Sequence, residues 1–306
     1  MPAVESSAPL GSGVVEHELP LIEVETVVEP PAQRRRRRPD IGFSLAAAWM
    51  IMIVGLALLA PYLPLQDPLA LSGDAREGPS FDHWLGTDNL SRDQLARLAE
   101  GARTSLTVGF VSAAIASVFG TLFGLFAGYH RRATETLLMG AMDILLAVPG
   151  LIFVIVLTSM LGAGVRNVII AISILAIPAF ARVARAQTLA YSERDFVKAA
   201  RSLGATRRRI LFREIAPNVL PTIAAYALVT VSAAIIIEGT LSFLGLGVPP
   251  EEPTWGGMIS GGRSYLRSAT HISLIPGLVL FLTVLSLSTL GEKLQRRHDA
   301  RAGFVS

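Results

Sequence analysis

The chain has 306 residues, of which 51% are hydrophobic and none is cysteine, and its mean hydropathy is +0.51. This composition is too apolar for a soluble globular domain, and the lack of cysteine excludes disulfides, thiolate metal sites and cysteine nucleophiles. The net charge of +3 does not indicate nucleic-acid binding, because the arginines surround apolar segments instead of covering one polar face. We therefore predict an all-α polytopic membrane protein.

The N-terminal segment, residues 1–40, is polar, contains several prolines and ends in five consecutive arginines at 34–38. It lacks the apolar residues of a core, so we predict a disordered cytoplasmic tail. Two roles are open for the arginine run, and they are compatible. It holds the N-terminus in the cytoplasm, or it contacts anionic lipid headgroups.

Six apolar windows long enough to cross a bilayer follow this tail, at about 43–63, 105–129, 137–161, 168–189, 219–244 and 272–290. They place a transmembrane domain at 41–291 and a C-terminal tail at 292–306. Counted on alternate sides of the spans, 20 Lys and Arg residues lie on the side of both termini and 7 on the other side. The positive-inside rule then predicts that both termini and the segment 196–217 are cytoplasmic, while 64–104 and 245–271 face outward.

The segment 196–217 is the only long, strongly basic, amphipathic stretch between the predicted spans. Apolar side chains recur at i, i+3, i+4 and i+7, which predicts a helix with one apolar face formed by Phe196, Ala199, Ala200 and Leu203. Gly204 is expected to end this helix, since glycine adopts positive φ without a Cβ penalty. A second short helix is predicted to begin with Thr206 as its N-cap and to end at Pro217.

Asp143 and Glu238 are the only acidic residues inside the apolar windows, and such residues are candidates for function because they are costly in a bilayer. For Asp143 we favour an ion pair or helix-end role over a place on a substrate path. For Glu238, which is followed by Phe243 and a glycine-rich stretch, a gate and a hydrogen-bonded packing role both remain open. The loop around Trp255 is expected to be scooped, and either docks a partner or contacts substrate.

Sequence signatures of catalysis are missing. There is no Gly-x4-Gly-Lys-Ser/Thr phosphate loop, no His pair at metal-binding spacing and no Gly-x-Ser-x-Gly nucleophile turn. We therefore expect a non-catalytic chain that has no metal site.

Four stretches resemble the permeases of bacterial ABC importers, in particular the dipeptide and oligopeptide branch. Lys198-Ala199-Ala200, Gly204 and Pro217 resemble the EAA loop of these permeases, although Lys198 stands where the general pattern has Glu and Ala216 where it has Leu. Similar matches occur at 85–106, at Asp143 to Pro149 and at 238–247. The resemblance covers about residues 43–290.

The resemblance implies a type I ABC importer permease fold with six transmembrane helices and a cytoplasmic coupling helix-turn-helix. The docking residues for the ATPase would be Phe196, Lys198, Ala199, Ala200, Arg201, Leu203, Gly204, Arg207, Arg208 and Pro217. Separately from the resemblance, Asp143, Glu238, Phe243 and Trp255 are the candidates for a translocation path or gate, because they lie in or beside the apolar windows.

The implied partners are a homologous second permease, two ABC ATPases that carry ATP and Mg, an extracytoplasmic binding protein and the lipid of a bacterial inner membrane. The implied cargo is a dipeptide or oligopeptide. Nickel complexes, glutathione and haem are alternative cargoes. An ion-coupled secondary transporter is an alternative of another class, disfavoured by the lack of visible internal repeats.

Overall fold

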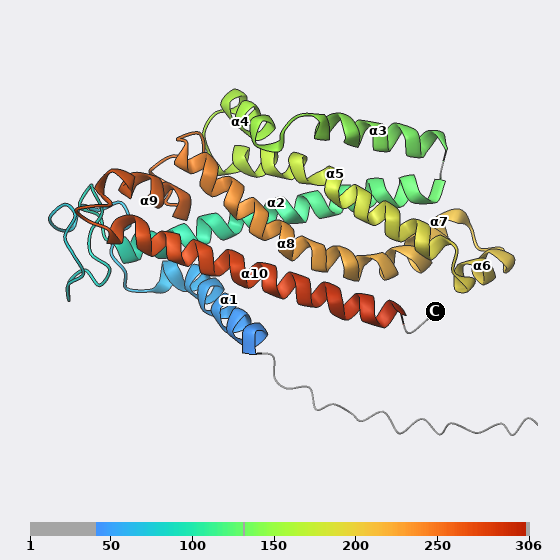
Figure 1. Cartoon of the computed structure of the whole chain (residues 1–306), viewed down its shortest axis with the longest axis horizontal. Coiled ribbons are helices and arrows are strands. Elements are labelled where there is room, and N and C mark those ends of the chain that lie inside the picture. Colours follow the sequence, from blue (N-terminus) through green and yellow to red (C-terminus); the bar gives the residue numbers. More distant parts are fainter. Residues whose placement is uncertain (1–40, 131, 304–306) are drawn as a thin grey trace, which may run out of the picture. The chain divides into compact units, whose positions relative to one another are not determined.

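The computed structural model describes residues 41–130 and 132–303 (Figure 1). The predicted tail at 1–40, with its arginine run, lies outside the described residues. The described elements are helical, apart from two isolated β-bridges, which confirms the predicted all-α class. The longer helices are α1 Ile41–Leu59, α2 Gln94–His130, α3 Ala133–Ala147, α4 Gly150–Leu161, α5 Val165–Ser192, α8 Ala216–Phe243 and α10 His271–Gly303, and the shorter ones are α6 Asp195–Ser202, α7 Arg207–Arg209 and α9 Trp255–Gly262.

Five described helical segments are long and apolar enough to cross a membrane, and a bent pair of helices adds a sixth candidate. The pair is α3 and α4, whose axes differ by 85°. The apolar window predicted at 137–161 is divided between these two helices, and the break has a local cause. Val148 is extended because it precedes Pro149, and Pro149 cannot continue the hydrogen bonding of α3.

Helix α2 lies among the other spans and packs against α1, α3, α5 and α8 (Figure 1). Helix α10 packs against α1, α8 and α9. Helices α2, α5, α8 and α10 lie along one another, so the bundle has two ends (Figure 1). We call them the α9 end, with α9 and the loop at 60–93, and the α6 end, with α6 and α7.

Three glycines on α2 allow its backbone to approach α5 closely. Gly120, Gly124 and Gly128 are spaced four residues apart, so they share one helix face. A Cβ on Gly124 would collide with the Ala181 carbonyl oxygen and the Ala184 side chain. These two helices are therefore in backbone contact over two turns.

The loop at 60–93 is organised by buried charged side chains. Asp88 accepts hydrogen bonds from the backbone N–H groups of Leu90 and Arg92 at 2.7 and 3.0 Å, and it pairs with the Arg92 guanidinium at 2.7 Å. Arg97, at the start of α2, approaches the same carboxylate to 3.4 Å. The loop is thereby joined to the first turn of α2.

His83 joins the two sides of this loop. Its Nδ1 lies 2.9 Å from Asp93 Oδ2 and its Nε2 lies 3.0 Å from the Ser72 carbonyl oxygen. Both partners are acceptors, and only the protonated imidazole has two N–H donors. The hydrogen bond to Asp93 is the largest cause that raises the pKa of His83 above 6.5, and burial opposes it.

We expect Gly124→Ala to lower the free energy of unfolding by about 1–3 kcal/mol, because an added Cβ overpacks the α2–α5 contact. The matched control is Gly140→Ala in α3, where a Cβ meets nothing within 4 Å. Unfolding of the purified protein in detergent measures both. Equal effects of the two substitutions would show that close packing at Gly124 is unimportant.

The pH dependence of stability tests the state of His83. Because the pKa of His83 is raised in the folded protein, the stability that its protonated form contributes is complete below about pH 6.5. That stability is lost as the pH rises through the folded-state pKa of His83. The His83→Gln variant keeps polar contacts but does not titrate. We expect the melting temperature of the wild type to fall more than that of the variant between pH 6 and pH 8.5, and parallel curves would contradict the assignment.

Candidate functional site

Helix α6 has one buried side and one exposed apolar side. Val197 has no exposed surface and packs with Ile210 and Leu211, which follow in the chain. Phe196 and Leu203 point away from that cluster and are 41% and 89% exposed. Ala199 is also exposed and Ala200 is half-buried, so most of the apolar face predicted from the sequence has no partner within the described chain.

The turn after α6 is a Schellman motif. The N–H of Ala205 donates to the Ala200 carbonyl oxygen, and the N–H of Gly204 donates to the Arg201 carbonyl oxygen, both at 3.0 Å. Gly204 has φ +79°, the left-handed conformation that the motif requires. The sequence-based expectation that Gly204 ends the helix is therefore met.

The next helix begins as expected but does not end where expected. Thr206 is the N-cap, with its Oγ1 accepting from the N–H of Arg209 at 3.3 Å. The chain then continues through a π-helical turn, Ile210–Ile215, directly into α8. The helix type changes between Ile215 and Ala216, next to the boundary predicted at Pro217, but the chain stays helical there. Proline is tolerated at this position because N–H groups in the first turn of a helix have no helical acceptor.

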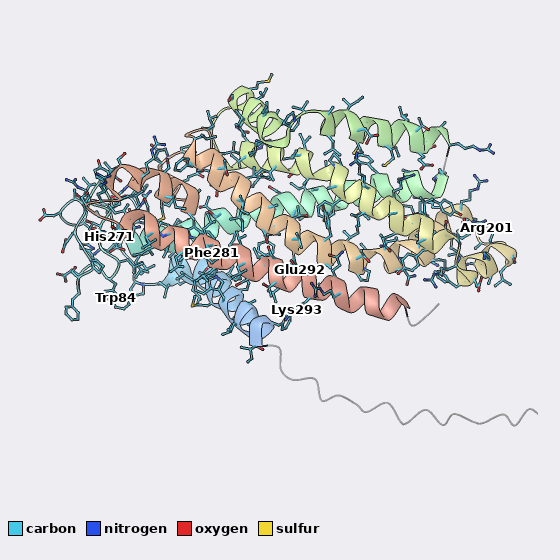
Figure 2. All side chains as sticks on the ribbon, viewed as in Figure 1. Trp84, Arg201, His271, Phe281, Glu292 and Lys293 are labelled. Atoms are coloured by element: carbon cyan, nitrogen blue, oxygen red, sulfur yellow. The ribbon has the colours of Figure 1, made fainter. Side chains whose placement is uncertain are left out.

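Arginines surround this segment. Arg208, Arg209 and Arg213 line an open hollow of about 510 Å³ together with Thr206 and Phe212. Arg201 and Arg207 are exposed beside it, and Figure 2 labels Arg201 at the α6 end. Lys198 pairs with Asp195 at 3.3 Å on the surface of α6. The α6 end thus presents exposed apolar side chains within a strongly basic surround.

Ion pairs connect α3 to α5. Asp143 accepts a hydrogen bond from the Arg182 guanidinium at 2.7 Å, and both side chains are more than half exposed. Glu135 pairs with Arg185 one turn farther along α5. The contacts of Asp143 are those of the ion pair favoured from the sequence.

Glu238 is completely buried in α8 and is held by hydroxyl groups. Ser242 Oγ donates to Oε1 at 2.8 Å, and Ser105 Oγ of α2 donates to Oε2 at 3.2 Å. Ser105 Oγ in turn accepts from the N–H of Trp255 at 3.2 Å, and Thr254 Oγ1 lies 3.5 Å from Ser242 Oγ. This carboxyl group therefore joins α2, α8 and the start of α9. Of the two roles left open for Glu238, these contacts are those of hydrogen-bonded packing.

The other two residues expected on a path lie apart. Trp255 has no exposed surface, and its indole N–H donates to the Leu98 carbonyl oxygen at 3.3 Å, so it belongs to the core instead of lining a surface. Phe243 is 41% exposed, and the Arg263 guanidinium lies 5.4 Å from its ring centre. The structure does not bring Asp143 and Glu238 together.

The hydroxyl partners of Glu238 were not predicted from the sequence. Ser242 is one helical turn from Glu238, so helix spacing would have found it. Ser105 is 133 positions away, and no local pattern connects it to α8. Among the described residues, no cluster of three His, Asp or Glu side chains could hold a metal ion.

Comparison with known proteins identifies this arrangement. Residues 120–303 match the family described as "Binding-protein-dependent transport system inner membrane component". The chain belongs to this family. The match includes the α6 segment, the bent α3–α4 pair and Glu238, so these are features of a permease.

Curated relatives cover nearly the whole chain. The permease is 36% identical over 287 residues to "Glutathione transport system permease protein GsiD" of Pectobacterium atrosepticum. The aligned region covers 92% of this chain and 95% of the relative. The permease is 37% identical to the protein of the same name from Escherichia coli O6:K15:H31, with coverage of 92% and 94%. The predicted membership of the importer permeases is confirmed.

Solved structures support the fold. An inward-facing structure of the MetNI methionine ABC transporter matches with a TM-score of 0.54 at 19% identity, over 66% of this permease and 96% of the matched chain. This similarity confirms the type I importer permease fold. The protein is thus a multi-pass inner-membrane permease subunit of a binding-protein-dependent ABC importer.

We expect Glu238→Ala to lower the free energy of unfolding by about 2–4 kcal/mol, because it leaves a cavity and buried hydroxyls that lose their acceptor. Glu100→Ala removes a partly exposed carboxylate that pairs with Arg103 at 3.5 Å and should cost about 1 kcal/mol or less. Unfolding in detergent separates the two. Similar small losses would contradict the joining role of Glu238.

Proposed function

We propose that this permease forms half of an import pathway for short peptides and is driven by ATPases that dock at α6. The observation that carries the proposal is the exposed apolar face of Phe196, Ala199 and Leu203. An apolar helix face of this kind binds in a groove on a partner. The arginines beside it can pair with acidic residues at the rim of such a groove and orient the partner.

The connection behind α6 suits the transmission of motion. Val197 is fixed against Ile210 and Leu211, and the π-helical turn continues into α8 without a flexible linker. A displacement of α6 by closure of the ATPases would therefore be passed to a membrane span. Such a segment is a two-state element that a remote nucleotide biases.

The proposal assigns sides to the two ends. The α6 end, both termini and the docking residues Lys198, Ala200, Arg201, Gly204, Arg207, Arg208 and Pro217 face the cytoplasm, in agreement with the count of positive charges. The α9 end faces the binding protein. Two ABC ATPases bring ATP and Mg, and a homologous second permease completes the pathway.

The proposed cargo is a short peptide. The relatives are named as glutathione permeases, and glutathione is itself a small peptide with carboxylate and ammonium groups. Glutathione is the alternative to dipeptides and oligopeptides as the cargo, and the names of the relatives support it. Nickel complexes and haem have no comparable support among these relatives.

Reconstitution tests this function. The proteoliposomes contain both permeases and both ATPases, and the binding protein is added on the opposite side of the membrane from the ATPases. They should take up glutathione or trialanine only when ATP is present on the side of the ATPases. A proton gradient without ATP should give no uptake. Uptake that persists without ATP and requires the gradient would establish the secondary transporter instead.

The docking face makes a specific prediction. Leu203→Glu places a charge on a side chain that is 89% exposed, so the permease should fold normally, but docking would bury an unpaired carboxylate. We expect at least about a tenfold loss of ATPase that co-purifies with the permease. The control is Leu71→Glu, which changes a leucine 77% exposed at the α9 end and should not affect this association. Equal recovery of ATPase with both variants would contradict docking at α6.

A further inference from the structure

An open hollow lies at the α9 end of the bundle, away from α6. Its volume is about 860 Å³, which is within the range of small-ligand sites. It is lined by α2, by the turn between α4 and α5, by the first turns of α5 and by the segment that connects α8 to α9. Figure 1 shows these segments, with the start of α5 and the end of α8 near one another.

The hollow combines an aliphatic lining with two opposite charges. Its apolar residues include Val111 and Ile115 of α2 and Ile169 of α5. Among its described lining residues, Arg166 and Glu252 are the ionisable ones. Both side chains are exposed, and neither forms an ion pair within the described chain.

Stability does not explain Arg166. It lies in the first turn of α5, where the positive end of the helix dipole disfavours a cation. No described carboxylate forms an ion pair with it. A cation that is placed unfavourably and has no partner is available for an anionic ligand.

Hydrogen bonds hold the backbone of the segment that carries Glu252. Its N–H donates to the Pro249 carbonyl oxygen at 3.0 Å, and Thr254 caps α9 by accepting from the N–H of Gly257 at 3.0 Å. Thr254 is also part of the hydroxyl network of Glu238, which is anchored to α2. The carboxylate is therefore carried by a segment that the core holds in place.

The turn that carries Arg166 is fixed as well. The side-chain amide of Asn167 donates to the carbonyl oxygens of Leu161 and Gly162 at 2.9 and 3.0 Å. These bonds hold the end of α4 against the start of α5. Both charged residues thus stand on braced backbone beside an apolar surface.

We propose that this hollow is a subsite that reads the charges of a zwitterionic short peptide on its way into the pathway, an inference that rests on the proposed import function. Arg166 binds the terminal carboxylate, Glu252 binds the ammonium group, and the aliphatic residues contact the side chains. A cargo with anionic groups alone, such as the two carboxylates of haem, would use Arg166 and be repelled by Glu252. A hollow lined by one positive and one negative side chain matches a ligand that carries both a carboxylate and an ammonium group.

Uptake by the reconstituted complete transporter tests the subsite with matched compounds. The probes are trialanine, trialanine amide and N-acetyl-trialanine, together with glutathione, its glycine ethyl ester and N-acetyl-glutathione. The permease variants are Arg166→Gln and Glu252→Gln, with the same binding protein throughout. Effects of the binding protein then cancel when a variant is compared with the wild type.

We expect Arg166→Gln to lower the uptake of trialanine relative to its amide by about threefold, the size typical of an exposed ion pair, without changing the ratio to the N-acetyl compound. Glu252→Gln should show the reverse pattern. Glutathione and its two derivatives should behave in the same way. Because the comparison uses ratios within one variant, a general loss of activity does not produce this pattern.

Two control variants change the same kinds of side chain outside the hollow. Arg267→Gln and Glu251→Gln alter exposed residues at the same end of the bundle, and neither should change the ratios. If the wild type takes up the peptides but Arg166→Gln and Glu252→Gln show the same uptake ratios as the wild type, the subsite alone is overturned. A wild type that takes up neither set with ATP would overturn the proposed peptide import, and the subsite with it.

Discussion

The close contact between α2 and α5 is the constraint on which the rest of the bundle depends. Glycines at 120, 124 and 128 remove the side chains that would separate the two backbones. In a bilayer, where lipid is as apolar as a helix surface, such packing is a main source of association between spans. It places the start of α5 beside α2 at one end and the end of α5 beside the π-helical turn at the other.

The two ends use this common frame differently. At the α6 end, Val197, Ile210 and Leu211 bury one side of a short helix and leave its other side exposed. At the α9 end, Glu238 and its hydroxyl partners bind the connecting segment to α2. A helix that is firmly held on one side and open on the other suits the docking of a partner. A braced loop beside a hollow suits the selection of a ligand.

The α3–α4 pair differs from the other spans. A bend of 85° at Pro149 interrupts helical hydrogen bonding within an apolar window, and lipid would leave those backbone groups without partners. Irregular backbone at membrane depth is tolerated where protein or water covers it. Ion pairs to Arg182 and Arg185 connect α3 to α5, and Val154 of α4 is buried against α5 as well, so both halves of the bent pair pack on the same helix.

Local sequence patterns determined much of this permease. Long apolar windows predicted the spans, helical spacing predicted the face of Phe196 and Leu203, and the backbone freedom of glycine predicted the turn at Gly204. These features depend on neighbouring residues only, and a single sequence therefore contains them. The similarity of the 196–217 segment to the EAA loop indicates the family from local sequence alone.

Tertiary structure decided what depends on residues far apart in the chain. Proline illustrates the limit, because Pro149 breaks a span while Pro217 enters the first turn of one, and the difference lies in the hydrogen bonds that each position requires. The burial of Trp255, the contact of Ser105 with Glu238 and the presence of Arg166 and Glu252 around one hollow follow from how the helices pack. No periodicity encodes these meetings, since each depends on the relative placement of separate helices.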